Sequence, residues 1–75
     1  MMARPRKHSL TLRGHRTSVS LEDEFWDAFC DIARADGKAL NELAAEIDAN
    51  RDMTGGLASE IRLFVFRRLR EQGQA

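Results

Sequence analysis

The chain has 75 residues, of which 43% are hydrophobic and 32% are charged. This composition is typical of a globular domain and excludes an intrinsically disordered chain. The single cysteine, Cys30, excludes an intrachain disulfide, and one cysteine with two histidines cannot form a four-ligand structural zinc site. A domain this small hides only about three-fifths of its unfolded surface, so we expect it to associate with further chains.

The 12 basic and 12 acidic residues cancel, but they are unevenly distributed along the chain. Residues 1–20 contain five basic residues and no acid, residues 21–60 contain eleven acids and three basic residues, and residues 61–75 contain four basic residues and one acid. Positive charge concentrated at one end favours contact with a polyanion, and a solvated basic tail is the alternative. No segment has the apolar length of a membrane span or a secretory signal, so we expect a cytoplasmic protein without a membrane partner.

The first part of the chain predicts an arm followed by extended structure. Residues 1–8 lack apolar periodicity and are interpreted as a flexible basic arm. From residue 9 to residue 21, apolar or β-branched residues alternate with polar ones on both sides of Gly14, which is typical of a strand. Gly14 permits a bend or an intrachain hairpin between the two halves.

The remainder predicts three helices. Ser20 followed by Asp23 resembles a capping box, which predicts that the first helix begins there, and Gly37 is the predicted stop. Apolar spacing predicts a second helix around residues 40–47 and a third over about residues 57–70.

The apolar residues of the third helix spread too widely for one face, so we expect it to have more than one neighbour; a buried strand over residues 61–66 is the alternative. Arg67, Arg68 and Arg70 at its end are expected to complement the helix dipole. No internal repeat is apparent in the chain.

A lone strand needs a partner, because its backbone donors and acceptors must be satisfied. Two copies that pair residues 16–21 antiparallel would form a two-stranded ribbon with the width of the DNA major groove. The side chains of Arg16, Ser18 and Ser20 would then face away from the helices, where they could bond to base edges.

The stretch RTSVSLEDEFWDAFCDIARADGKALNEL, residues 16–43, resembles the ribbon-helix-helix family of DNA-binding proteins, which includes the Arc and MetJ repressors. LTLRGHRTSVSLEDEFWDAF followed by LASEIRLFVFRRL resembles a subgroup of short bacterial proteins with this domain. The resemblance implies that Arg16, Ser18 and Ser20 face the groove, and that Asn41 lies in a helical turn whose amides bind a phosphate. The short serines and the absence of a capping hydroxyl at Ala39 depart from the usual family pattern.

We therefore predict a mainly α fold with one N-terminal β-strand: an intertwined ribbon-helix-helix homodimer whose antiparallel ribbon is intermolecular, with an extra C-terminal helix. The domain is expected over residues 9–72, followed by a tail over residues 73–75. The predicted function is sequence-specific or semi-specific binding of double-stranded DNA to regulate transcription. The alternative is a dimeric module that has lost base readout and binds a further protein partner. No catalytic constellation, cofactor site or metal site is expected, so the chain is not predicted to be an enzyme.

The sequence also predicts which side chains carry these roles. The residues expected to contact DNA phosphates are Arg4, Arg6, Lys7, Arg13, His15, Lys38 and Asn41. The residues expected to form the dimer core are Thr17, Val19, Leu21, Phe25, Phe29, Ile32, Leu40, Leu43, Ile47, Ile61, Phe64 and Val65.

Overall fold

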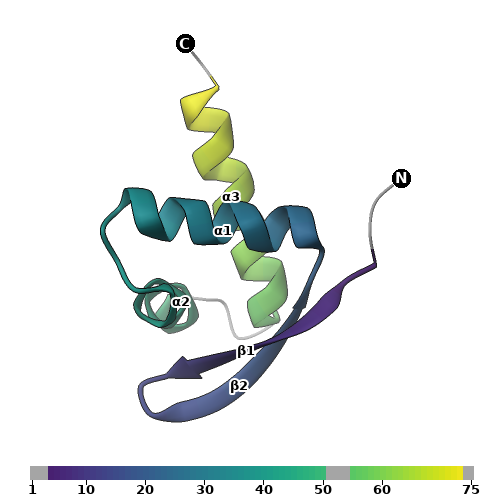
Figure 1. Ribbon diagram of the computed structural model, residues 1–75, viewed down its shortest axis with the longest axis vertical. Helices are drawn as coiled ribbons and strands as arrows, with labels where there is room; N and C mark the ends of the chain where they lie inside the picture. The colour runs from purple at the N-terminus through teal and green to yellow at the C-terminus, as the bar shows by residue number, and fades with distance from the viewer. Residues whose placement is uncertain (1–3, 51–54, 74–75) are drawn as a thin grey trace.

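The computed structural model describes residues 4–50 and 55–73. The elements follow in the order β1 (Arg6–Leu12), β2 (His15–Leu21), α1 (Asp23–Ala35), α2 (Leu40–Ala49) and α3 (Leu57–Gln72). The two strands form a hairpin along one side of the molecule, and the three helices lie over one face of it (Figure 1).

The hairpin is formed within one chain, which corrects the prediction of one strand that pairs with a second copy. β1 pairs antiparallel with β2 from Arg6↔Leu21 to Leu12↔His15. The two residues of the turn, Arg13 (φ 52°) and Gly14 (φ 84°), both have positive φ angles. Positive φ at both positions is the geometry of a type I′ turn, whose twist matches that of the flanking strands. The strand begins at Arg6, so residues 6–8 of the predicted arm belong to the sheet.

Helix α1 begins later than the capping-box interpretation predicted. Ser20 and Leu21 are still part of β2, and the residue before the helix, Glu22, makes no side-chain cap. The predicted stop at Gly37 is confirmed: Gly37 has a φ of 69°. Its N–H donates to the Arg34 carbonyl at 3.1 Å, and the Lys38 N–H donates to the Ala33 carbonyl at 2.9 Å. This pair of bonds is a Schellman motif, which a glycine completes without steric cost.

The other two helices occur where their spacing predicted them. α2 begins after Ala39, which provides no side-chain cap. α3 is helical throughout residues 61–66, which excludes the alternative strand. It contacts α1, α2 and β2, so its broad apolar surface has the several neighbours that were expected.

The hydrophobic core is closed within a single chain. Its buried residues come from both strands and all three helices: Leu10, Leu12, Val19, Leu21, Phe29, Ile32, Ala33, Leu43, Ala44, Ile61 and Val65. Of the predicted dimer core, Phe25, Leu40, Ile47 and Phe64 are partly buried against this cluster. Thr17 is half-buried. Within one chain these residues pack in or against the same cluster, and Leu10 and Leu12 of β1 are buried in it as well.

Two arginines of α3 bind the residues that flank α1. The Nε of Arg62 donates to Glu22 Oε1 at 2.9 Å, directly before α1. Both terminal nitrogens of Arg68 donate to the Asp36 carboxylate at 2.9 Å, directly after α1. Arg68 also lies 5.4 Å from the centre of the Phe64 ring. Arg68 is thus bound to a side chain of another element in addition to lying near the end of its own helix.

These two ion pairs predict a specific loss of stability in acid. The hydrogen bonds from Arg62 lower the pKa of Glu22 below 4.5, and those from Arg68 lower the pKa of Asp36 below 3.8. A carboxylate whose pKa is lower in the folded state stabilises the fold above its unfolded pKa, and this contribution is lost as the pH falls through the folded pKa. We expect the melting temperature to fall as the pH drops below about 4.5.

The measurement is thermal unfolding by circular dichroism between about pH 7 and pH 3. The double variant Glu22→Gln/Asp36→Asn should melt lower than the parent at neutral pH and should lose less between neutral and acid pH. Asp27→Asn, on the exposed face of α1, is the control for removing a carboxylate. Parallel profiles of the double variant and the parent would show that the two ion pairs do not cause the acid sensitivity.

Candidate nucleic-acid interface

The outer face of the hairpin is entirely exposed and polar. Arg16, Ser18 and Ser20 lie on this face of β2, pointing away from the helices as the alternation predicted. Three exposed side chains of β1 lie directly opposite them, in the pairs Lys7↔Ser20, Ser9↔Ser18 and Thr11↔Arg16. We call these six residues the outer row.

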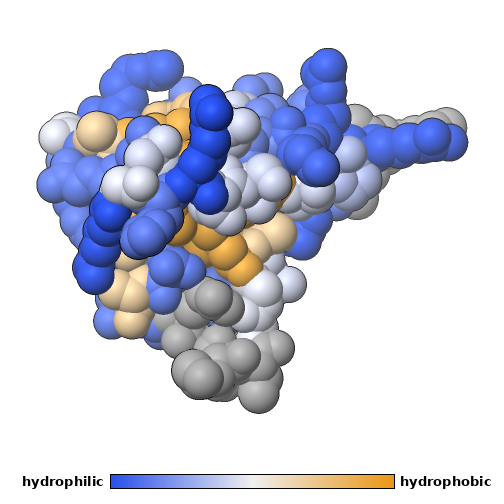
Figure 2. All heavy atoms as spheres, turned by 90° about the horizontal axis from the view of Figure 1, so that it is seen from below, coloured by the Kyte–Doolittle hydropathy of each residue, from blue (hydrophilic) through white to orange (hydrophobic). Residues whose placement is uncertain are grey.

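The charge of this part of the chain is of one sign. Residues 4–21 contain five basic residues and no acid, and the first acid along the chain is Glu22. Figure 2, which views the molecule from the hairpin side, shows long hydrophilic side chains over much of this surface, with a smaller hydrophobic area between them. A cationic surface attracts phosphates, and in the absence of acidic side chains no repulsion opposes this attraction.

One of the five cations has an acidic neighbour. Arg6 lies 3.5 Å from Asp23, but both side chains are well exposed, and such pairs contribute at most about 1 kcal/mol. Within residues 4–50 and 55–73, no ion pair holds the side chains of Arg4, Lys7, Arg13 or Arg16. Four of the five cations of residues 4–21 are therefore available to a ligand.

The other predicted phosphate contacts are placed differently. His15 is exposed, but it lies on the strand face opposite to Arg16, Ser18 and Ser20. Lys38 donates to Glu46 at 2.7 Å, which raises the pKa of Lys38. Asn41 accepts a bond from the Thr11 N–H at 3.1 Å through its side-chain oxygen. Lys38 and Asn41 thus already have partners within the fold, whereas Lys7, Arg13 and Arg16 of the hairpin have no ion pair among the described residues.

Both outer edges of the hairpin are bound by helices of the same chain. On the β1 edge, Asn41 of α2 satisfies the Thr11 N–H. On the β2 edge, Arg62 of α3 donates to the Ser20 carbonyl at 3.2 Å. These bonds tie both edges of the hairpin to the helical layer that lies behind the outer row.

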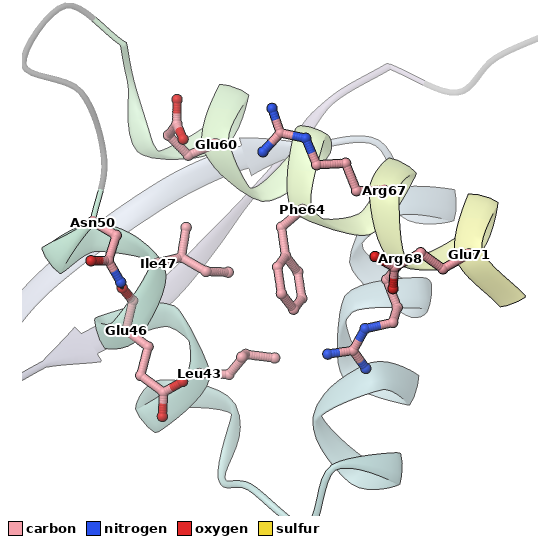
Figure 3. A pocket seen from close by; sticks show the side chains of 9 residues that line it. All are labelled: Leu43, Glu46, Ile47, Asn50, Glu60, Phe64, Arg67, Arg68 and Glu71. Carbon is pink, nitrogen blue, oxygen red and sulfur yellow. The ribbon is translucent and has the colours of Figure 1, made fainter.

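A second candidate site is an open groove of about 450 Å³ between α2 and α3. Figure 3 shows Phe64 pointing into it toward Leu43 and Ile47. Its rim carries charges of both signs, from Glu46, Glu60, Arg67, Arg68 and Glu71. This mixture of charges is less suited to a nucleic acid than the outer row, because the acids would repel phosphates.

Three large apolar side chains of α3 are exposed to solvent: Leu63 (43%), Phe66 (56%) and Leu69 (48%). They are spaced three residues apart, which places them along one side of the helix. We call these three residues the α3 stripe. Exposed apolar side chains that lie together are typical of a surface that contacts another protein.

Among the described residues, no three His, Cys, Asp or Glu side chains are grouped closely enough to hold a metal ion. No helix within residues 4–50 and 55–73 combines the length and the apolar character needed to cross a bilayer.

Comparison with known proteins identifies the family. The family model of the ribbon-helix-helix domain matches residues 5–69, which is most of the chain and includes the hairpin, α1, α2 and most of α3. Comparison with curated proteins and with solved structures finds no match. Members of this family are typically DNA-binding regulators and are generally not enzymes. The chain therefore belongs to the ribbon-helix-helix family.

Proposed function

We propose that the protein binds double-stranded DNA by inserting the hairpin into the major groove, and that it regulates transcription in this way. The observation that carries the proposal is the outer row: an exposed, polar, acid-free face on a two-stranded ribbon. A two-stranded β-ribbon fits the major groove. The family supports duplex DNA as the partner. Because the resemblance is to bacterial proteins, and bacterial DNA lies in the cytoplasm, the proposed location is the cytoplasm.

Base contacts are assigned to Arg16, Ser18 and Ser20. An arginine can form two hydrogen bonds to the O6 and N7 atoms of guanine, and serine hydroxyls can donate to or accept from several bases. Because serines are short, part of the readout is expected to pass through bridging water or DNA shape, which gives semi-specific binding. Phosphate contacts are assigned to the exposed cations Arg4, Arg6, Lys7 and Arg13, with His15 beside the turn.

The proposal predicts steep salt dependence. Each phosphate neutralised by a basic side chain contributes about −0.9 to the slope of log affinity against log salt. Four such contacts should lower affinity for a duplex by roughly a hundredfold between about 50 and 200 mM salt. Fluorescence anisotropy with a labelled random duplex checks this result. Absence of detectable duplex binding at both salt concentrations would contradict the proposed function.

The homodimer is proposed to form through the α3 stripe, since β1 and not a second copy pairs with β2. Leu63 and Leu69 lie at equal distances along the helix from Phe66. Two antiparallel α3 helices related by a twofold axis at Phe66 would therefore place Leu63 against the partner's Leu69. A self-complementary patch of this kind is what a twofold interface requires.

Sedimentation equilibrium at micromolar concentration tests this interface. We expect the parent to sediment as a dimer and Phe66→Glu to sediment as a single folded chain, because a charge at the centre of an apolar interface is costly to bury. Arg67→Glu, on the neighbouring exposed position, is the control and should remain dimeric. A parent that sediments as a single chain would contradict the homodimer.

The second candidate function is a dimeric protein-interaction module without base readout. It is favoured by the groove between α2 and α3, whose apolar floor and mixed-charge rim suit a peptide segment better than DNA. Duplex binding separates the two candidates. Under this alternative, replacing the cations of the outer row would leave partner binding unchanged, whereas Phe64→Ala in the groove floor would weaken it.

A further inference from the structure

The two strands of the hairpin repeat one pattern at an offset of nine residues. RKHSLTL in β1 and HRTSVSL in β2 have the same order of exposed, half-buried and buried positions. The exposed residues match in kind: Lys7 corresponds to Arg16, Ser9 to Ser18 and Thr11 to Ser20. In each strand the outer face therefore carries a cation, then a serine, then a second hydroxyl.

Because the strands are antiparallel, this repeat makes the outer row nearly symmetric. Ser9 and Ser18 pair with each other at its centre. Lys7 lies opposite Ser20 and Arg16 lies opposite Thr11, so the two cations are at diagonally opposite corners. A half-turn about an axis through the Ser9↔Ser18 pair exchanges each outer residue with its counterpart in the other strand.

We propose that one chain carries a complete, pseudo-twofold reading ribbon, in which Lys7 and Arg16 contact equivalent bases on the two DNA strands. The inference rests on the proposed function and extends base readout to Lys7, Ser9 and Thr11 of β1, so that Lys7 contacts a base in place of a phosphate. The recognised element is a short pseudo-palindrome, and a single chain occupies it. A ribbon assembled from two chains would be symmetric because the chains are identical; here the repeat within the hairpin has the same effect.

The edges of the hairpin support a ribbon that is complete in one chain. The Thr11 N–H points away from β2, because it donates to Asn41, and the Ser20 carbonyl points away from β1, because it accepts from Arg62. A strand from a second copy could pair fully with either edge only if one of these bonds were broken. The ribbon therefore remains two-stranded, with both strands from the same chain.

The spacing of the two cations predicts the spacing of the bases. Lys7 and Thr11 are four residues apart on β1, and Arg16 is opposite Thr11. Four residues of a strand span about 13 Å, which is about four base-pair steps of roughly 3.4 Å. Lysine and arginine both bond to guanine in the major groove. We therefore expect two guanines, one on each strand, about four base-pair steps apart.

The first test selects duplexes from a random pool and compares variants on the enriched sequence by anisotropy titration. Lys7→Ala and Arg16→Ala should each weaken binding roughly 5- to 150-fold and should each relax the preference at one of the two guanines. Arg4→Ala removes the same charge just outside the strand. It should weaken binding to all duplexes alike and reduce the salt slope by about one contact. Circular dichroism verifies that each variant folds.

The second test needs no DNA and asks whether the ribbon belongs to one chain. Ser9↔Ser18 is a directly opposed pair whose backbone groups point outward, and such pairs have Cα atoms close enough for a disulfide. The variant Ser9→Cys/Ser18→Cys is made with Cys30→Ala, so that only the two new thiols can be oxidised by oxidised glutathione. Non-reducing electrophoresis and mass spectrometry should then show a single chain that is two hydrogens lighter.

The outcomes separate this inference from the proposed function. Absence of duplex binding by the parent would overturn the proposed function and, with it, this inference. Specific binding in which Lys7→Ala behaves like Arg4→Ala would overturn the inference alone, as would disulfide-linked dimers in the second test. Two guanine preferences that are lost separately in Lys7→Ala and Arg16→Ala, with an intrachain disulfide, would support it.

Discussion

Replacing Leu10 with alanine is expected to lower the free energy of unfolding by about 2 to 5 kcal/mol, the usual range for truncating a buried leucine. Leu10 is 2% exposed and is among the largest fully buried side chains, although it lies on β1, before the stretch of residues 16–43 that resembles the Arc and MetJ repressors. Chemical denaturation with urea measures the change. Ser9→Ala, the exposed neighbour on the same strand, should shift the midpoint little.

The difference in stability between Leu10→Ala and Ser9→Ala tests whether β1 is packed on the core. If β1 were detached and β2 paired with a second copy, the Leu10 side chain would contribute little to the core. Equal stabilities of Leu10→Ala and Ser9→Ala would then follow, which would contradict the pairing of β1 with β2. A large loss in Leu10→Ala should be accompanied by loss of duplex binding, because the outer row depends on the same hairpin.

Phe29→Ala is expected to cost more, about 3 to 5 kcal/mol. Phe29 is completely buried at the centre of α1, with its ring edge-on to Phe64 at 6.4 Å and tilted against Trp26 at 6.2 Å. A domain of this length is expected to have a total stability of only about 4 to 11 kcal/mol. The variant should therefore unfold at much lower urea concentration than the parent, or be partly unfolded in its absence.

The matched control is Phe66→Ala, which removes the same ring from a position that is 56% exposed. Its unfolding midpoint should stay near that of the parent when measured at a concentration where both are single chains. If Phe29→Ala and Phe66→Ala lost similar stability, the core would not be arranged around α1 as the structure shows. Comparison of the two variants thus distinguishes the stability lost by removing a buried ring from the stability lost by removing an exposed one.

The elements of local origin could be predicted from the sequence. The three helices follow from apolar residues at helical spacing, and the end of α1 follows from Gly37, whose positive φ a residue with a side chain rarely adopts. The alternation over residues 9–21 predicted that Arg16, Ser18 and Ser20 are exposed, because successive side chains of a strand point to opposite faces.

The start of α1 shows where local signals fail. Ser20 and Asp23 have the spacing of a capping box, but Ser20 is held in β2, and its carbonyl accepts a bond from Arg62 of α3. The carboxylate of Glu22, the residue at the cap position, is likewise bound by Arg62, 40 residues away in the chain. A local capping pattern contains no information about such bonds from distant residues, which hold Ser20 and Glu22 in other interactions.

The sequence predicted the β2 residues of the outer row, but of the β1 residues it predicted only Lys7, as a phosphate contact. β1 contributes Lys7, Ser9 and Thr11 to the outer row, and a signal for this was present in the alternation around Leu10 and Leu12. The turn was harder to recognise, because Arg-Gly is not among the dipeptides that most strongly indicate a type I′ hairpin. The nine-residue repeat preserves the character of the side chains more than their identity, so it is recognised only when the two strands are set in register.

The sequence by itself determined the periodic faces of each element, the position of Gly37 and the concentration of positive charge before Glu22. Only the tertiary structure decided that β2 pairs within its own chain, that Asn41 and Lys38 have partners in the fold, and that both edges of the hairpin are held by helices. The reason is physical. Side-chain direction within a helix or strand follows from backbone geometry over a few residues, whereas the partner of a strand edge or a charged group depends on which distant segments the folded chain brings beside it.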